Sequence, residues 1–472
     1  MVERAATSLR DYVAALSHTT YLYIWLAECI KQAGNWFTFV AAYAVITELS
    51  GADAATHTAL FLICRRAPYL VLFPLTGLAA DRLNRGALLV VVCLLQGAVS
   101  FSLPLVRFYG KIELLYPLVL LQYSAQAFYD PARMASVPLV VPPKYLCVAG
   151  TLDTYGYSFM ALGGATLAGR TAAVYGTGVC FVIEGISFLL AAAMNVPLAR
   201  HVAARRGPQG KLSAPGASSG LAEPSDAAPL LQPLLSDAGP SGPTPGAQAL
   251  RELEAPAAAS EGGLFGFLGA LSYMSRRPNW DVAVLVWVKA TGAMVWGAAD
   301  VLNGRFAQSV AMQSLGGPDQ TLGLILAGMG LGCVVGPLIA NGITPGVARF
   351  WRISIAVAFV MLSGGYALMA RATNIWYVLP ATVLRSSGSN TLWCHSLAIL
   401  QHRLEDSIRG RVFAVEFVLY TISEAGSTLF GGYALDGLSW GSSPTSAALA
   451  GLAAVFAAVW ALHAVILWRD RR

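Results

Sequence analysis

The chain has 472 residues, of which 56% are hydrophobic and only 12% are charged. Soluble proteins carry about 25% charged residues, and soluble cores stop growing near roughly 250–300 residues, so a soluble chain of this length would need several charged domain surfaces. The composition therefore excludes a soluble enzyme, a nucleic-acid-binding protein and a disordered scaffold. It predicts a multi-pass membrane protein.

Long apolar segments recur along the chain, each near the roughly 20 residues that a helix needs to cross a bilayer. They lack the alternation over about ten residues that marks a membrane β-barrel. In the first half they cover residues 20–48, 56–79, 87–107, 114–135, 149–170 and 176–198. In the second half they cover residues 280–304, 320–341, 350–371, 374–400, 411–434 and 444–468. We therefore predict an all-α membrane protein with twelve transmembrane helices.

One segment differs in composition from the rest of the chain. Residues 199–261 are rich in Pro, Ala, Gly and Ser, a composition that cannot bury enough apolar surface to become ordered. This predicts a six-helix bundle over residues 1–198, a disordered linker over 199–261 and a second six-helix bundle over 262–472. The apolar stretch 264–278 ends in two arginines and predicts an interfacial helix before the second bundle.

The basic residues predict the orientation in the membrane. If both termini and the linker share one side, 21 of the 31 lysines and arginines lie on that side and five lie on the other. The remaining five lie within spans. Because cytoplasmic loops carry the excess of Lys and Arg, both termini and the linker are predicted to be cytoplasmic, in the plasma membrane or an internal membrane.

An internal repeat is visible when the chain is shifted by 263 residues. Asp153 then falls on Glu416, and Gly169 falls on Gly432. Transporter folds are often built from such repeats, with the binding site near the bilayer midplane between the halves. The repeat therefore predicts a central site and a rocking motion of two halves.

The loop after the second span reads Gly77-Leu-Ala-Ala-Asp81-Arg82-Leu-Asn-Arg85. It resembles the G-x-x-x-D-R-x-x-R signature of the major facilitator superfamily. The resemblance implies that Gly77 allows close helix packing, that Asp81 accepts hydrogen bonds or pairs with a cation, and that Arg82 and Arg85 hold the loop at the cytoplasmic face. The loop is then a gate that forms in one access state and breaks in the other.

A narrower resemblance covers most of the chain except the linker. Residues 128–153 and 409–436 are similar to the third drug:proton antiporter group, which includes enterobactin and macrolide exporters. This implies export by proton antiport. Three departures count against it: Gly163-Gly164 replaces the Gly-Pro of the group's fifth helix, the second copy of the loop signature over 341–350 is degenerate, and the linker is longer.

Ten ionisable residues lie within the predicted spans, where each charge costs at least about 2.5–3.5 kcal/mol at the helix centre. Five are cations and five are carboxylates, so ion pairing is the default interpretation. The cations are Lys31, Arg65, Arg66, Lys289 and Arg385, and the carboxylates are Glu28, Glu184, Asp300, Glu416 and Glu424.

Two of these carboxylates are candidates for proton coupling. Glu28 lies three residues before Lys31 on one helical face, and Glu424 lies deep in the eleventh span. A carboxyl group that moves between a desolvated place and the neighbourhood of a cation changes its affinity for a proton. A structural ion pair is the alternative for Glu28.

The resemblance also implies that the first, fourth, seventh and tenth helices line the substrate cavity. Pairing of Lys289 and Arg385 with Glu424 or Asp300, and packing of the remaining side chains, are the alternatives. The candidate cavity residues are Lys31, Arg66, Gln122, Gln126, Lys289 and Arg385. Nearer the cytoplasm we expect a charge network in which Asp153 and Glu416 bind loop arginines, and its members are Arg133, Asp153, Arg409, Arg411 and Glu416.

The sequence thus predicts a secondary transporter working by alternating access, which exports a small organic molecule by proton antiport. A transporter of an anionic metabolite or lysolipid without proton antiport and a non-transporting receptor or scaffold on the same fold are the alternatives. The cysteines show no metal-ligand spacing, and no GxxxxGK[ST] loop is present, so we expect no metal, no cofactor and no enzymatic activity. The expected partners are a small-molecule substrate, protons and the lipid bilayer, and the chain is expected to be monomeric.

Overall fold

The computed structural model describes residues 9–142, 145–205, 264–344, 348–404 and 406–469. The predicted all-α architecture is confirmed, because every predicted span coincides with one helix or with consecutive helices in the described residues. The first half contains α1 (Leu9–Leu16), α2 (Thr19–Ser50), α3 (Ala54–Arg82), α4 (Arg85–Ser102), α5 (Pro104–Tyr109), α6 (Leu115–Val140), α7 (Leu146–Tyr175) and α8 (Thr177–Arg205). The second half contains α11 (Leu264–Ser275), α12 (Trp280–Leu285), α13 (Trp287–Trp296), α14 (Ala299–Gln308), α15 (Pro318–Ile343), α16 (Ala348–Ala370), α17 (Ile375–Arg403), α18 (Asp406–Gly432) and α19 (Ser442–Arg469).

Among the described residues, seven helical segments are long and apolar enough to cross a membrane by length and composition. They correspond to α4 with α5, α8, α12 to α14, α15, α16, α18 and α19. The long helices α2, α3, α6, α7 and α17 fall outside this set, and most of the buried charged and amide side chains discussed below lie on them. The buried charged and amide side chains are therefore concentrated on these five helices.

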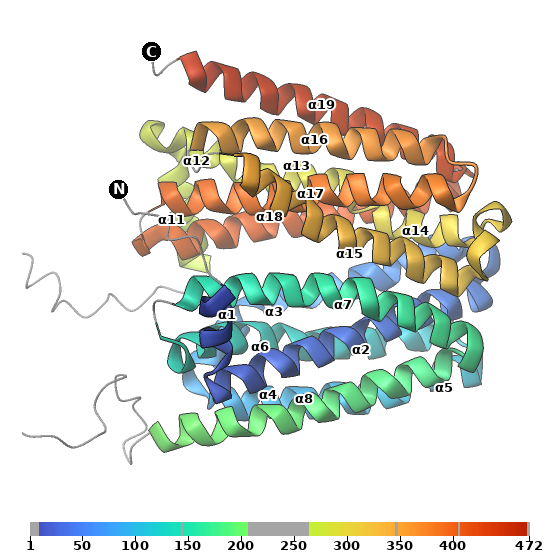
Figure 1. The fold of residues 1–472 in the computed structure, drawn as a ribbon, viewed down its shortest axis with the longest axis horizontal. Coiled ribbons are helices and arrows are strands. Elements are labelled where there is room, and N and C mark those ends of the chain that lie inside the picture. The colour runs from blue at the N-terminus through green and yellow to red at the C-terminus, as the bar shows by residue number, and fades with distance from the viewer. Residues whose placement is uncertain (1–8, 143–144, 206–263, 345–347, 405, 470–472) are drawn as a thin grey trace, which may run out of the picture.

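The helices of the two halves occupy separate regions of the molecule (Figure 1). Helices α2, α3, α4, α6, α7 and α8 pack on one another, as do α13 and α15 to α19. Direct packing between the halves comes chiefly from two helix pairs, α7 with α15 and α3 with α18. We call the end where α8 finishes and α11 begins the linker end, and the other end the opposite end (Figure 1).

Helix α8 continues to Arg205 instead of ending at residue 198, so residues 199–205 of the expected linker are helical. The cause is packing: Leu198 and Val202 are 1% exposed and belong to a core cluster with residues of α2, α4 and α6. The rest of the expected linker, residues 206–261, lies outside the described residues. The expected interfacial segment is helical over Leu264–Ser275.

Two glycines related by the sequence repeat make equivalent close approaches between the halves. Gly169 of α7 lies against the start of α15, where a Cβ atom would meet the Asp319 carbonyl oxygen at 2.4 Å. Gly432 of α18 lies against the start of α3, where a Cβ atom would meet the Ala59 Cβ at 3.0 Å. Nearby, the Thr56 amide donates a hydrogen bond to Asp436 Oδ2 at 2.6 Å. The halves are thus in contact at the opposite end.

We expect Gly169→Ala to destabilise this contact, because the new methyl group needs space that the α15 backbone occupies. Overpacking of this kind costs about 1–3 kcal/mol. The matched control is Gly163→Ala on the same helix, where a Cβ atom would meet nothing within 4 Å. Thermal unfolding of the purified full chain measures both variants, and equal stability of the two would contradict this account of the interface.

Candidate functional site

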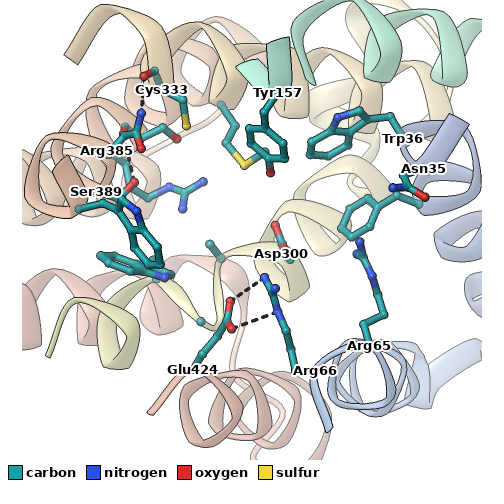
Figure 2. A pocket seen from close by; sticks show the side chains of 18 of the residues that line it. Asn35, Trp36, Arg65, Arg66, Tyr157, Asp300, Cys333, Arg385, Ser389 and Glu424 are labelled. Carbon is teal, nitrogen blue, oxygen red and sulfur yellow. Dashed lines mark hydrogen bonds and ion pairs between the residues drawn. The ribbon is translucent and has the colours of Figure 1, made fainter. Parts of the chain in front are cut away.

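A cavity of about 240 Å³ lies between the two halves (Figure 2). Residues of α2, α3 and α7 form one wall, and residues of α13, α14, α15, α17 and α18 form the other. The wall carries three arginines and two carboxylates, which leave one net positive charge. The charged residues are Arg65, Arg66, Asp300, Arg385 and Glu424.

An ion pair joins the two halves at this cavity. Arg66 Nε of α3 lies 3.1 Å from Glu424 Oε2 of α18, and Arg66 Nη2 donates to Glu424 Oε1 at 3.1 Å (Figure 2). The Arg66 side chain is 49% exposed and the Glu424 side chain 13%, so the arginine faces the cavity over a shielded carboxylate. Arg66, a candidate cavity residue, therefore pairs with Glu424, a candidate for proton coupling.

Arg385 is buried but incompletely paired. Its side chain is 3% exposed and points into the cavity from α17 (Figure 2). Among the described residues, its Nε and Nη2 atoms have no hydrogen-bond partner. Neither Glu424 nor Asp300 pairs with it, so the alternative of an ion pair is wrong for this residue.

Arg65 and Asp300 also line the cavity, although the sequence pointed to them only as charges within spans. Arg65 Nε donates to the Tyr123 hydroxyl at 2.7 Å, and its guanidinium lies over the Phe39 ring at 4.7 Å. In the described part of the chain, Asp300 makes no hydrogen bond or ion pair. Adjacent arginines point about 100° apart on a helix, yet Arg65 and Arg66 both reach this cavity.

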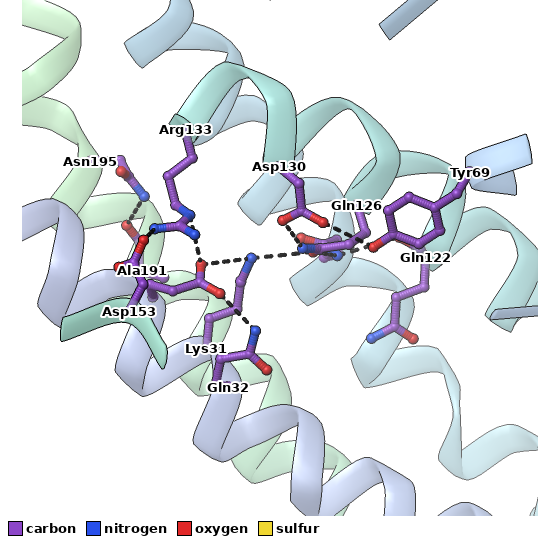
Figure 3. A network of polar contacts seen from close by, with 12 residues as sticks. Lys31, Gln32, Tyr69, Gln122, Gln126, Asp130, Arg133, Asp153, Ala191 and Asn195 are labelled. Atoms are coloured by element: carbon purple, nitrogen blue, oxygen red, sulfur yellow. Dashed lines mark hydrogen bonds and ion pairs between the residues drawn. The ribbon is translucent and has the colours of Figure 1, made fainter. Parts of the chain in front are cut away.

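Lys31 lies inside the first half rather than on the cavity wall (Figure 3), and its partner Glu28 is also outside the cavity lining. Lys31 Nζ is 3.1 Å from Glu28 Oε2 and lies 3.4 Å from the centre of the Tyr129 ring. Arg133 bridges Glu28 at 3.6 Å and Asp153 at 2.9 Å. The expected cavity role of Lys31 is thus not supported, because its ammonium group pairs with Glu28 and lies over the Tyr129 ring. The expected pairing of Arg133 with Asp153 is present.

The amides expected to line the cavity are buried in the same interior (Figure 3). Gln126 accepts a hydrogen bond from Lys31 at 3.3 Å and donates to Asp130 at 2.7 Å. Gln122 donates to Glu184 Oε1 at 3.1 Å. Helix α6 turns this face toward α2, α4 and α8. The expectation that Gln122 and Gln126 line the cavity is therefore corrected, because helix packing directs both amides into the first half.

Lys289 and Glu416 form a buried ion pair in the second half. Lys289 Nζ lies 2.8 Å from Glu416 Oε2, with the two side chains 6% and 3% exposed. The same ammonium lies 4.5 Å from the centre of the Trp393 ring. Two expectations are corrected: Lys289 does not line the cavity, and Glu416 pairs with Lys289 rather than with loop arginines. Arg409 donates instead to the carbonyl oxygens of Gln401 and Leu404.

Arg411, the last member of the expected network, is partly buried on α18, close to α11. In the expected gating loop, α3 ends at Arg82 and α4 begins at Arg85. Arg85 Nη1 donates to the Ala135 carbonyl oxygen at 2.7 Å, which ties the loop to α6. The surroundings of Gly77 and the side chains of Asp81 and Arg82 lie outside the described part of the structure, so the roles of these residues stay predictions.

Aromatic side chains complete the cavity and were not selected from the sequence. One group comes from the first half, where the Trp36 ring lies 5.6 Å from Phe39 and 6.0 Å from Tyr157. The other comes from the second half, where the Tyr420 ring lies 5.2 Å from Trp393 and 6.4 Å from Trp296. In the described residues, no cluster of His, Cys, Asp and Glu could hold a metal ion.

Solved structures of the same architecture cover nearly the whole chain. The POT family transporter PepTSo is similar over 96% of this chain and 99% of its own, with a TM-score of 0.63 at 13% identity. A POT family transporter in complex with a thioalcohol-conjugated peptide is similar over 96% of this chain and 96% of its own, with a TM-score of 0.64 at 10% identity. A third, in complex with 5-aminolevulinic acid, is similar over 94% of this chain and 96% of its own, with a TM-score of 0.64 at 12% identity. The chain has the major facilitator fold.

A family comparison supports the same class. Residues 11–221 match the family described as transmembrane secretion effector, which spans the first half of the chain. No curated protein matches the chain in sequence. The chain therefore has the fold of these transporters, and its first half is similar to the transmembrane secretion effector family.

Proposed function

We propose that the protein exports a small organic molecule by alternating access, with a proton moving in the opposite direction. The observation that carries this proposal is the Arg66–Glu424 pair, because it joins the two halves at the cavity. Protonation of Glu424 removes the charge that holds Arg66. A proton can thereby change the contact between the halves, which is what coupling requires.

The environment of Glu424 suits this role. Besides Arg66 and Tyr69 on α3, the charged or titratable groups near the pair are Tyr157 on α7, Asp300 on α14 and Tyr420 on α18. Asp300 is the second carboxylate on the cavity wall.

The arrangement of the halves supports an assignment of the access state. Besides contacts nearer the cavity, the halves approach closely at the opposite end, where Gly169 lies against Asp319 and Thr56 bonds to Asp436. With the linker placed in the cytoplasm by the basic residues, the cavity is then reached from the cytoplasmic side. Two similarities favour export. The family that matches the first half is described as a secretion effector, and the sequence resembles the third drug:proton antiporter group.

We assign the interior of the first half a supporting role in this mechanism. Glu28 is 9% exposed and contacts both Lys31 and Arg133, so a proton reaches it only if that interior opens. Glu28 is therefore our second candidate for coupling. Lys31 and Arg133 share the Glu28 carboxylate. A proton on Glu28 would therefore leave Asp153 as the carboxylate with which Arg133 pairs.

Flux in proteoliposomes tests the proposal. The purified full chain is reconstituted, and uptake or efflux of a metabolite panel is measured with and without an imposed pH gradient. Antiport predicts accumulation that follows the gradient and collapses when a protonophore is added. Flux that does not depend on the gradient would exclude proton antiport. Absence of flux for every compound, together with Glu424 variants that behave like the unmodified protein, would favour the receptor or scaffold.

A further inference from the structure

The central cavity has an excess of positive charge that the coupling pair does not use. Arg66 and Glu424 neutralise each other, which leaves Arg65, Asp300 and Arg385. Arg65 is engaged with Tyr123 and the Phe39 ring. Arg385 has a side-chain hydrogen bond with Tyr366, but two of its three guanidinium nitrogens, Nε and Nη2, make no hydrogen bond to any described residue.

The structure holds Arg385 in place without neutralising it. Its guanidinium packs over the ring of Tyr366 at 5.3 Å, and Tyr366 is itself fully buried and anchored to the Val295 carbonyl oxygen at 3.0 Å. A Cβ atom on Gly365 would meet the Arg385 Cβ at 2.7 Å, so glycine is required for this approach of α16 to α17. An oriented, buried guanidinium with two unpaired nitrogens can donate charge-assisted hydrogen bonds to an anion.

Flat apolar walls face this charge from both halves. Trp36, Phe39 and Tyr157 form one wall, and Trp296, Trp393 and Tyr420 form the other. Aromatic rings bind a planar ring by stacking or by edge-to-face contact. The cavity volume of about 240 Å³ is below the roughly 300–1,000 Å³ of pockets for drug-sized ligands, so it suits one small ring system and not a lysolipid.

We propose that the cavity binds a small aromatic monoanion, with its carboxylate or sulfonate on Arg385 and its ring between the two aromatic walls. The single net positive charge of the wall matches one negative charge on the ligand. This inference rests on the proposed transport function for its biological use. The binding itself is measured without a gradient, so failure of antiport and failure of anion recognition give different results.

Equilibrium binding of radiolabelled benzoate to the full chain in nanodiscs tests the proposal. Unlabelled benzoate should displace the label, whereas benzamide and benzylammonium, which have the same ring but no negative charge, should displace it at least about tenfold less well. Arg385→Gln should weaken benzoate binding about tenfold to a hundredfold, as expected for loss of a charge-assisted contact. Arg385→Lys should retain part of the affinity, because it keeps the charge but loses the planar donor pair.

The control is Arg371→Gln, which removes an exposed arginine far from the cavity and should leave benzoate binding unchanged. Thermal unfolding confirms that each variant is folded. Three outcomes would overturn the proposal: no saturable benzoate binding, equal displacement by benzoate and benzamide, or unchanged benzoate affinity in folded Arg385→Gln. A fall in stability of Arg385→Gln with unchanged benzoate selectivity would assign Arg385 a structural role only.

Discussion

Glu424→Gln is expected to abolish accumulation driven by a pH gradient while exchange of substrate across the membrane continues. The amide keeps the shape of the carboxylate but cannot change its charge, so Arg66 loses the partner to which it is joined at 3.1 Å. One pH unit supplies about 1.4 kcal/mol per proton, which corresponds to a tenfold concentration ratio. The variant should lose this ratio and retain counterflow.

The measurement compares gradient-driven accumulation and counterflow in the same proteoliposomes. Glu113→Gln is the matched control, because Glu113 is an exposed carboxylate in the turn between α5 and α6. Full accumulation in folded Glu424→Gln would show that coupling uses another group, and Glu28→Gln is then the next variant. Loss of both accumulation and counterflow would show that the pair serves the fold or the rocking motion instead.

Lys289→Met is expected to destabilise the protein by about 3–5 kcal/mol, because it leaves Glu416 as an uncompensated buried charge. The Lys289–Glu416 pair is enclosed, with side chains 6% and 3% exposed. The double variant Lys289→Met with Glu416→Leu should recover most of this loss, since two apolar side chains of similar volume replace the pair. Thermal unfolding in detergent follows the three proteins.

The chain supplies its own matched control for this second prediction. Arg107 and Glu48 form an ion pair of similar length, 3.0 Å, but their side chains are 49% and 47% exposed. Arg107→Met should therefore cost less than about 1 kcal/mol. If Lys289→Met were no more harmful than Arg107→Met, the buried pair would not be a structural element, and a transport role for Lys289 would have to be reconsidered.

The fold was largely predictable because each span carries its own signal. Twenty apolar residues cross a bilayer whatever their neighbours are, so the spans of α4, α16 and α19 follow from local composition. The end of α8 was less predictable: residues up to Arg205 stay helical because Leu198 and Val202 pack against other helices. Composition alone does not contain that contact.

The candidate site was predictable only in part. Arg66 and Arg385, two of the candidate cavity residues, line the cavity, and so does the coupling candidate Glu424. Lys31 and Lys289 have the same sequence signature, a single cation in an apolar helix, yet each is engaged by a carboxylate and an aromatic ring within its own half. Whether a charge faces the cavity depends on the rotation of its helix, which an isolated helical segment does not determine.

The sequence by itself determined the class of protein, the membrane spans and the ten charges within them that require an explanation. The tertiary structure decided which of these charges neutralise one another and which face the cavity. The physical reason is sequence distance: Lys289 and Glu416 are 127 residues apart, and Arg66 and Glu424 are 358 residues apart. No local rule selects such partners, because the packing of whole helices brings them together.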